Sequence, residues 1–167
     1  SRGLGDVYKR QVRKATLYIC GLGFYEAYIN GKKIGDQVLA PTPTDYSKSV
    51  KYNRFDVTGQ LLKGANAIGV ILGNGRYTSM RMPGVRHFDV PKMIAQLEVY
   101  YEDGEKRVIA SDASWKITAE GPIGTNNEFD GEEYDARKEM PGWNTYPFDD
   151  TKWLQAEVVS LPGGKLE

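Results

Sequence analysis

Hydrophobic and polar residues alternate along much of the chain. Residues 24–30 read FYEAYIN, in which every second position from Tyr25 can face a core. A period of two gives a strand two unlike faces, and no stretch keeps the 3.6-residue period of a long helix. The pattern predicts strands at residues 14–22, 24–30, 50–57, 66–72, 92–101, 106–110 and 115–118, with a short last strand at 156–159. We therefore predict an all-β protein.

Two turn signals connect neighbouring strands. Asn30-Gly31 ends one predicted strand, and Asp103-Gly104 joins strand 92–101 to strand 106–110. These residue types tolerate the positive φ that tight hairpin turns require. The alternation and the turns together predict an antiparallel β-sandwich of about eight strands.

One short helical turn is predicted after residue 57. Thr58 is suited to cap it, and Gly64 is suited to end it. Such a turn would bring Leu61 and Leu62 inward.

The two ends of the chain differ from its middle. Residues 1–11 (SRGLGDVYKRQ) show no strand alternation and resemble translated adapter sequences at the ends of metagenomic gene fragments; an ordinary flexible segment is the alternative. Either origin predicts a disordered or non-native segment at 1–11 and one folded domain over 12–167. The chain ends in LPGGKLE with no capping element, so we expect a truncated fragment of a larger protein.

Composition narrows the classes of partner. Lys plus Arg and Asp plus Glu both number 22, and this balance argues against nucleic acid, which needs a basic excess. No apolar run approaches the ~20 residues of a membrane span, so no membrane partner is expected. Cys20 is the only cysteine and is expected as a small buried hydrophobe. His87 is the only histidine and lies in a predicted loop, where we expect a structural role rather than a general base.

An acidic run, NNEFDGEEYDARKE, covers residues 126–139. Its oxygens suit calcium, but the spacing of an EF-hand loop is missing, and a solvated acidic loop partly paired with Arg137 and Lys138 is the favoured interpretation. Two of its carboxylates could also act as the acid and the base that a glycosidase requires. The sequence has no nucleophile elbow, phosphate loop or zinc spacing, so no cofactor, no metal site and no catalytic residue is predicted.

Sugar binding is the chemistry that best suits the predicted loops. Asn74, Arg76 and Tyr77 lie in one loop, where polar side chains bond hydroxyl groups and an aromatic face stacks on a sugar ring. Tyr46 and Trp143 are further candidates. For each of these residues a place at the rim or in the core is the alternative.

Five segments follow one another in a family order: YEAYINGKKIGDQVLAP, TDYSKSVKYNRFDVTGQLLKGANAIGVILGNG, LEVYYEDGEKRVIASDASWK, FDGEEYDAR and PGWNTYPFDD. They resemble the N-terminal β-sandwich domain of bacterial α-L-rhamnosidases over residues 13–165. The first segments also occur in sugar-binding sandwiches of other exo-glycosidases, such as β-galactosidases. FDGEEYDAR followed by PGW and FDD favours the rhamnosidases.

The resemblance implies a galactose-binding-domain-like jelly roll attached to a larger glycoside hydrolase. In that family the catalytic carboxylates lie downstream in a helical barrel, which would be this chain's partner in the same polypeptide, and hydrolysis inverts the anomeric centre. Some relatives bind rhamnose through calcium on this module, so a rhamnose-directed carbohydrate-binding module is an alternative function. The family usually has Trp where this chain has Arg76, which weakens stacking at this loop. We expect a scaffold that positions substrate.

Overall fold

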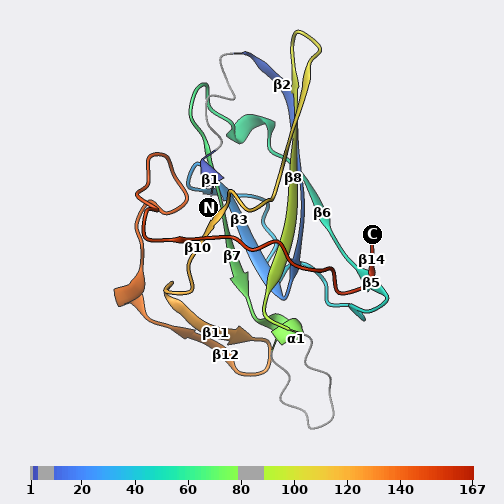
Figure 1. The fold of residues 1–167 in the computed structure, drawn as a ribbon, viewed down its shortest axis with the longest axis vertical. Helices are drawn as coiled ribbons and strands as arrows, with labels where there is room; N and C mark the ends of the chain where they lie inside the picture. Colours follow the sequence, from blue (N-terminus) through green and yellow to red (C-terminus); the bar gives the residue numbers. More distant parts are fainter. Residues whose placement is uncertain (1, 4–9, 79–88) are drawn as a thin grey trace.

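The computed structural model describes residues 2–3, 10–78 and 89–167, and its regular secondary structure is almost entirely strand. Two four-stranded sheets form its centre (Figure 1). The first sheet has the order β1 (Arg2–Gly3), β7 (Ala67–Gly73), β3 (Phe24–Ile29), β4 (Lys32–Lys33). The second has the order β6 (Asn53–Asp56), β2 (Val12–Leu22), β8 (Lys92–Tyr101), β9 (Lys106–Ala110). All neighbours within these two sheets are antiparallel, which confirms the predicted all-β sandwich.

Both predicted hairpins are confirmed. Asn30 and Gly31 have φ of 50° and 79° and join β3 to β4, as a primed two-residue turn requires. Gly104 has φ of 87° in the turn between β8 and β9. The left-handed backbone of these residues is the reason that the dipeptides predict turns.

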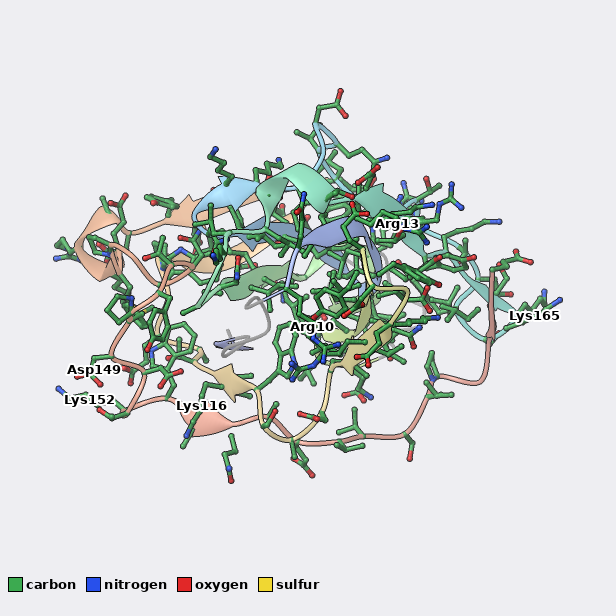
Figure 2. All side chains as sticks on the ribbon, turned by 90° about the horizontal axis from the view of Figure 1, so that it is seen from above. Arg10, Arg13, Lys116, Asp149, Lys152 and Lys165 are labelled. Atoms are coloured by element: carbon green, nitrogen blue, oxygen red, sulfur yellow. The ribbon has the colours of Figure 1, made fainter. Side chains whose placement is uncertain are left out.

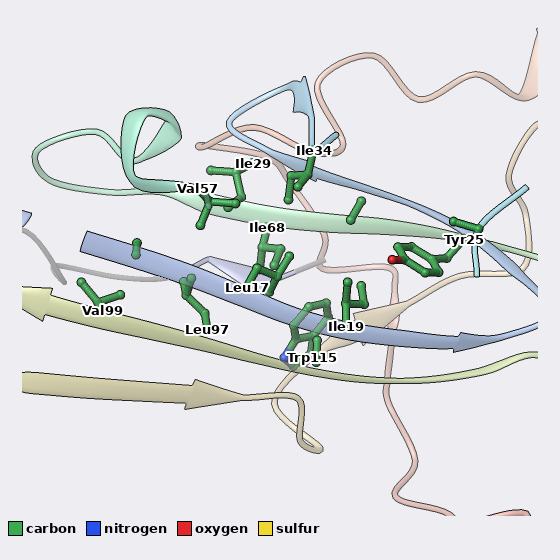
Figure 3. Close-up of a cluster of buried hydrophobic side chains, with 14 of the residues drawn as sticks. Leu17, Ile19, Tyr25, Ile29, Ile34, Val57, Ile68, Leu97, Val99 and Trp115 are labelled. Atoms are coloured by element: carbon green, nitrogen blue, oxygen red, sulfur yellow. The ribbon is translucent and has the colours of Figure 1, made fainter. Parts of the chain in front are cut away.

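The core lies between the two sheets (Figure 3). Leu17 and Leu97 reach it from β2 and β8 of the second sheet, and Ile29 and Ile68 reach it from β3 and β7 of the first. The side chain of Trp115 packs into the same core between the two sheets. The period-two pattern predicts these inward positions because successive strand residues point to opposite faces.

The predicted helical turn forms, but its details differ. It is the 3₁₀ helix η1 (Thr58–Gln60), and Val57 rather than Thr58 is its N-cap. The Thr58 hydroxyl instead accepts a hydrogen bond from the backbone N–H of Ala15, 2.8 Å away. Leu61 packs against the core, whereas Leu62 is exposed. Thr58 therefore ties the turn to β2 instead of capping it.

Three short strand pairs and two further helices complete the fold of the described residues. The pairs are β10 (Lys116–Ile117) with β13 (Leu154–Gln155), β11 (Ile123–Asn127) with β12 (Gly131–Tyr134), and β14 (Lys165–Leu166) with β5 (Ser49–Val50), the last being parallel. The helices are α1 (Gly75–Thr78) and the 3₁₀ helix η2 (Ala136–Lys138).

Three sequence predictions need correction here. The predicted strand 50–57 is divided into β5 and β6, which belong to different sheets. The acidic run is not a plain loop, because it contributes to the β11–β12 hairpin. Residues 156–159 form no strand, because the strand that pairs with β10 covers only Leu154 and Gln155.

The N-terminal segment is described only in part. Arg2–Gly3 pairs with β7, and Arg10 forms ion pairs with Asp103 and Glu105 at the β8–β9 turn. A folded domain over residues 12–167, with a segment before it that adds little stability, stays a prediction. His87 lies outside the described residues.

Candidate functional site

The three predicted sugar-binding residues lie at one end of the sandwich, where β7 leads into helix α1 beside the β11–β12 hairpin (Figure 1). Asn74 is the residue between strand and helix, and Arg76 and Tyr77 belong to the helix. The sequence thus places them correctly in one short segment. Their side chains, however, have different surroundings.

Asn74 joins α1 to the hairpin. Its backbone N–H donates to the Oδ1 atom of Asn126 at 2.7 Å, and its own Oδ1 accepts from the backbone N–H of Asn126 at 3.3 Å. The Asn126 amide lies so close to Gly73 that a Cβ atom there would be 2.4 Å from its Oδ1. This pair of reciprocal bonds fixes the hairpin against the end of β7.

Arg76 pairs with the acidic run. Its guanidinium donates to both carboxylate oxygens of Glu128, with Nη2 at 3.0 Å from Oε2. The guanidinium also lies 5.7 Å from the centre of the Phe129 ring, a cation–π distance. The hydrogen bond from Arg76 to Glu128 raises the pKa of Arg76 further. The positively charged group at this loop is therefore bound to a carboxylate within the same protein.

Tyr77 is buried, with 2% of its surface exposed. Its ring meets that of Tyr46 edge to face, with centroids 5.1 Å apart. Burial is the main reason that the pKa values of both phenols are raised. These rings and the side chains of Cys20, Leu22 and Val50 form a second hydrophobic cluster. Both rings thus occupy core positions in this structure, the alternative that the sequence left open.

Trp143 is also part of the packing. Its ring meets that of Tyr28 edge to face, with centroids 5.6 Å apart, and it covers Gly69 of β7. Carbohydrate binding by Asn74, Arg76 and Tyr77 stays a prediction.

Cys20 is the buried small hydrophobe that the sequence predicts. It is almost fully buried on β2, and burial raises the pKa of its thiol to about 11. A thiol of this kind is protonated at neutral pH and is a poor nucleophile.

The acidic run is spread along the hairpin and η2 rather than gathered at a point. Glu128 pairs with Arg76, and Asp135 pairs with Arg137 as the sequence predicts. Asp130 accepts from the side-chain amide of Asn127 at 3.2 Å. Within residues 2–3, 10–78 and 89–167, no group of three or more His, Cys, Asp or Glu side chains is placed to hold a metal ion.

Sequence reasoning missed Asn126 and Glu128 as partners of this segment. The available signal was Asp130-Gly131, a third hairpin dipeptide, with Gly131 at φ of 80°. A hairpin there places Asn126 on a strand that can reach β7 and Glu128 in the turn that follows this strand. The arrangement suits a polar edge at which Arg76 and Glu128 neutralise each other.

Two hollows of the described surface lie away from these three residues. One, of about 200 Å³, is lined by residues 37–42 and Asn53, and the other, of about 220 Å³, lies beside Glu133 and Tyr134.

No helix among the described residues is long and apolar enough to cross a membrane.

A comparison with protein families decides where this fold belongs. Residues 10–167 match the sequence model described as the alpha-L-rhamnosidase N-terminal domain. The chain belongs to this family. Membership confirms the resemblance seen in the sequence and covers the sandwich, the hairpin and the C-terminal segment alike.

Individual relatives agree with the family assignment. An alpha-L-rhamnosidase of Formosa agariphila is 41% identical over 86% of the chain, and one of Streptomyces avermitilis is 43% identical over 87% of it. The solved alpha-L-rhamnosidase from Dictyoglumus thermophilum superposes on 99% of the chain with a TM-score of 0.90 and 48% identity. The chain spans only 16%, 14% and 18% of these three relatives, respectively. This rhamnosidase N-terminal domain thus corresponds to a small part of each longer polypeptide.

Proposed function

We propose that this chain is a non-catalytic module of an α-L-rhamnosidase that removes terminal α-L-rhamnose from glycans or glycosides. Its role in that enzyme is to support and position, and the bond-breaking residues belong to the rest of the polypeptide. The observation that carries the proposal is the match of nearly the whole chain to less than a fifth of several alpha-L-rhamnosidases.

The hydrogen bonds of several carboxylates also favour a structural role over a catalytic one. Glu128 is held by Arg76, and Glu98 of β8 accepts from Lys106 of β9 at 2.8 Å. Glu26 of β3 likewise accepts from Tyr28 at 2.6 Å and from Lys33. Burial alone would raise the pKa of Glu26, but these two hydrogen bonds lower it overall. A general acid needs a raised pKa, so Glu26 is tuned in the opposite direction.

The first test is the activity of the chain by itself. We expect turnover of an aryl α-L-rhamnoside to equal the buffer blank. Measurable hydrolysis that is lost in Asp130→Asn or Glu133→Gln would contradict the proposal, because it would place the reaction on the acidic run.

The second test restores the missing part. In a chimaera, this chain replaces the matching segment of the Streptomyces avermitilis relative. We expect the chimaera to hydrolyse the same aryl rhamnoside, and a version with the segment deleted to lose most of that activity. A chimaera that folds, as judged by circular dichroism, but has no activity would contradict the assignment as a rhamnosidase module.

A further inference from the structure

The C-terminal segment carries a group of exposed aliphatic side chains. Residues 154–162, which we call the C-terminal arm, read LQAEVVSLP and contain one charge, Glu157. Leu154, Val158 and Leu161 are 72%, 76% and 78% exposed. Single exposed aliphatic residues are ordinary on a protein surface, but several on one weakly charged segment indicate a contact surface.

The arm begins as a continuation of the core. Trp115 and Ala156 are opposite each other where the arm meets β10, joined by a hydrogen bond of 2.8 Å from the Ala156 N–H. Both contribute to the core between the sheets. Two residues further along the same strand pair, Ile117 lies opposite Leu154. Side chains two residues apart share a strand face, so the covered pair continues into an apolar pair that is exposed in the described structure.

Beyond Ala156 the arm crosses the molecule with little support. Figure 2 shows it along the outer side of the molecule between Lys152 and Lys165. The chain is fixed again at Gly164, packed on Tyr46 and Val50, and at the N–H of Lys165, which donates to Lys48 at 2.9 Å. Among the described residues, the N–H groups of residues 157–161 donate no hydrogen bond to the protein. The arm is therefore anchored at both ends and uncovered between them.

We propose that the C-terminal arm is the surface on which the remainder of the rhamnosidase polypeptide packs, through an apolar face of its own. This inference rests on the function proposed above. It is supported by the chain length of the relatives, of which this chain spans 14–18% in the four curated cases, so most of each polypeptide is available to cover the arm.

A covalently connected partner fits the small size of this surface. A standard interface between separate proteins uses about 20–30 residues on each side, far more than the arm offers. A connected partner has a high effective concentration and avoids most of the entropy cost of association, so a smaller apolar contact suffices. A second copy of this chain fits less well for the same reason.

Hydrogen exchange tests the proposal directly. The two samples are the chain by itself and the chimaera with the Streptomyces avermitilis relative. We expect the amides of residues 157–161 to exchange at least about tenfold more slowly in the chimaera, while those of residues 61–64 exchange equally in both. Equal exchange of the arm in the two samples would overturn the inference.

Charged variants test it independently. Val158→Lys with Leu161→Lys is expected to leave the melting temperature of the isolated chain within about 1 °C and to lower that of the chimaera by about 2 °C or more. Leu62→Lys is the matched control, since Leu62 is also exposed, at 58%, and lies outside the arm. An equal effect of the arm variant and the control on the chimaera would contradict the inference.

The readouts separate this inference from the function on which it rests. An active chimaera with an unprotected arm overturns the inference and keeps the function. A protected arm in a folded but inactive chimaera keeps the docking surface and contradicts the function. Light scattering of the isolated chain is expected to give a monomer. A dimer that only the arm variant dissociates would identify a second copy as the occupant and overturn the proposal.

Discussion

Asn66 holds the loop between η1 and β7 from a completely buried position. Its Oδ1 accepts from the N–H of Leu62 and from the side chain of Asn30, at 2.8 and 2.7 Å. Its Nδ2 donates to the carbonyl groups of Leu62 and Gly64, at 2.8 and 3.0 Å. Every polar atom of the amide therefore has a partner, and the network connects this loop to the β3–β4 turn through Asn30.

Removing this amide should destabilise the protein. We expect Asn66→Ala to lower the free energy of unfolding by about 2–4 kcal/mol, because it leaves several buried donors and acceptors unpaired. Urea denaturation measures the change. Gln37→Ala, at an exposed amide, is the control and is expected to stay within about 0.5 kcal/mol. Equal small effects of the two variants would show that water replaces the network at no cost.

Strand β7 is packed from outside the sandwich by the segment around Trp143. A Cβ atom at Gly69 would lie 2.5 Å from the Trp143 ring and 3.0 Å from the Asn144 side chain. The neighbouring aromatic pair, Phe148 with Trp153, meets edge to face with centroids 5.6 Å apart. The aromatic residues of this region therefore anchor it by packing, and Gly69 provides the space for one of them.

A methyl group at Gly69 should therefore weaken this contact. We expect Gly69→Ala to lower the free energy of unfolding by about 1–3 kcal/mol through overpacking. Gly59→Ala is the matched control, since Gly59 lies in η1 with no atom within 4 Å of a new Cβ and has no positive φ. The control should be neutral or more stable by up to about 1 kcal/mol, because it restricts the unfolded chain. Urea midpoints that fall equally for both would contradict the packing seen around Trp143.

The whole molecule carries many carboxylates that are hydrogen-bonded at the surface. Ser47 lowers the pKa of Asp45 to about 2, and Thr58 and Lys106 lower the pKa values of Asp56 and Glu98. Each contact favours the charged carboxylate of the folded state. The three lie in separate parts of the chain, so their effects are distributed over the sandwich.

Acid should therefore destabilise the protein. A carboxylate with a lowered pKa in the folded state stabilises it above the unfolded pKa, about 4 for Asp and Glu, and this stabilisation is lost as the pH falls. We expect the melting temperature to be level above about pH 5 and to fall between about pH 4.5 and pH 2. Asp45→Asn should make the fall smaller, because one of the contributing groups no longer titrates. A melting temperature that is constant or rises over this range would contradict the assignment.

The long strands β2, β3, β7, β8 and β9, the hairpin turns at Asn30-Gly31 and Asp103-Gly104, and the family were determined by the sequence alone. Alternation identifies strands because neighbouring strand residues face opposite ways, and Asn30-Gly31 and Asp103-Gly104 identify turns because their backbone conformation is local. Leu17 and Ile29 are core residues because they lie on the inward faces of their strands. The order of the segments, ending in PGW and FDD, was enough to indicate the α-L-rhamnosidase family.

Only the tertiary structure decided which side chains outside the strand pattern are buried and which distant residues they contact. Tyr77 is buried against Tyr46, and Asn74 bonds Asn126, which is 52 positions away. The parallel pairing of β14 with β5 likewise joins segments more than a hundred residues apart. A period of two gives a strand its two faces but does not say which distant segment lies on either of them. That choice depends on how the sheets, the hairpin and the C-terminal arm pack together in space.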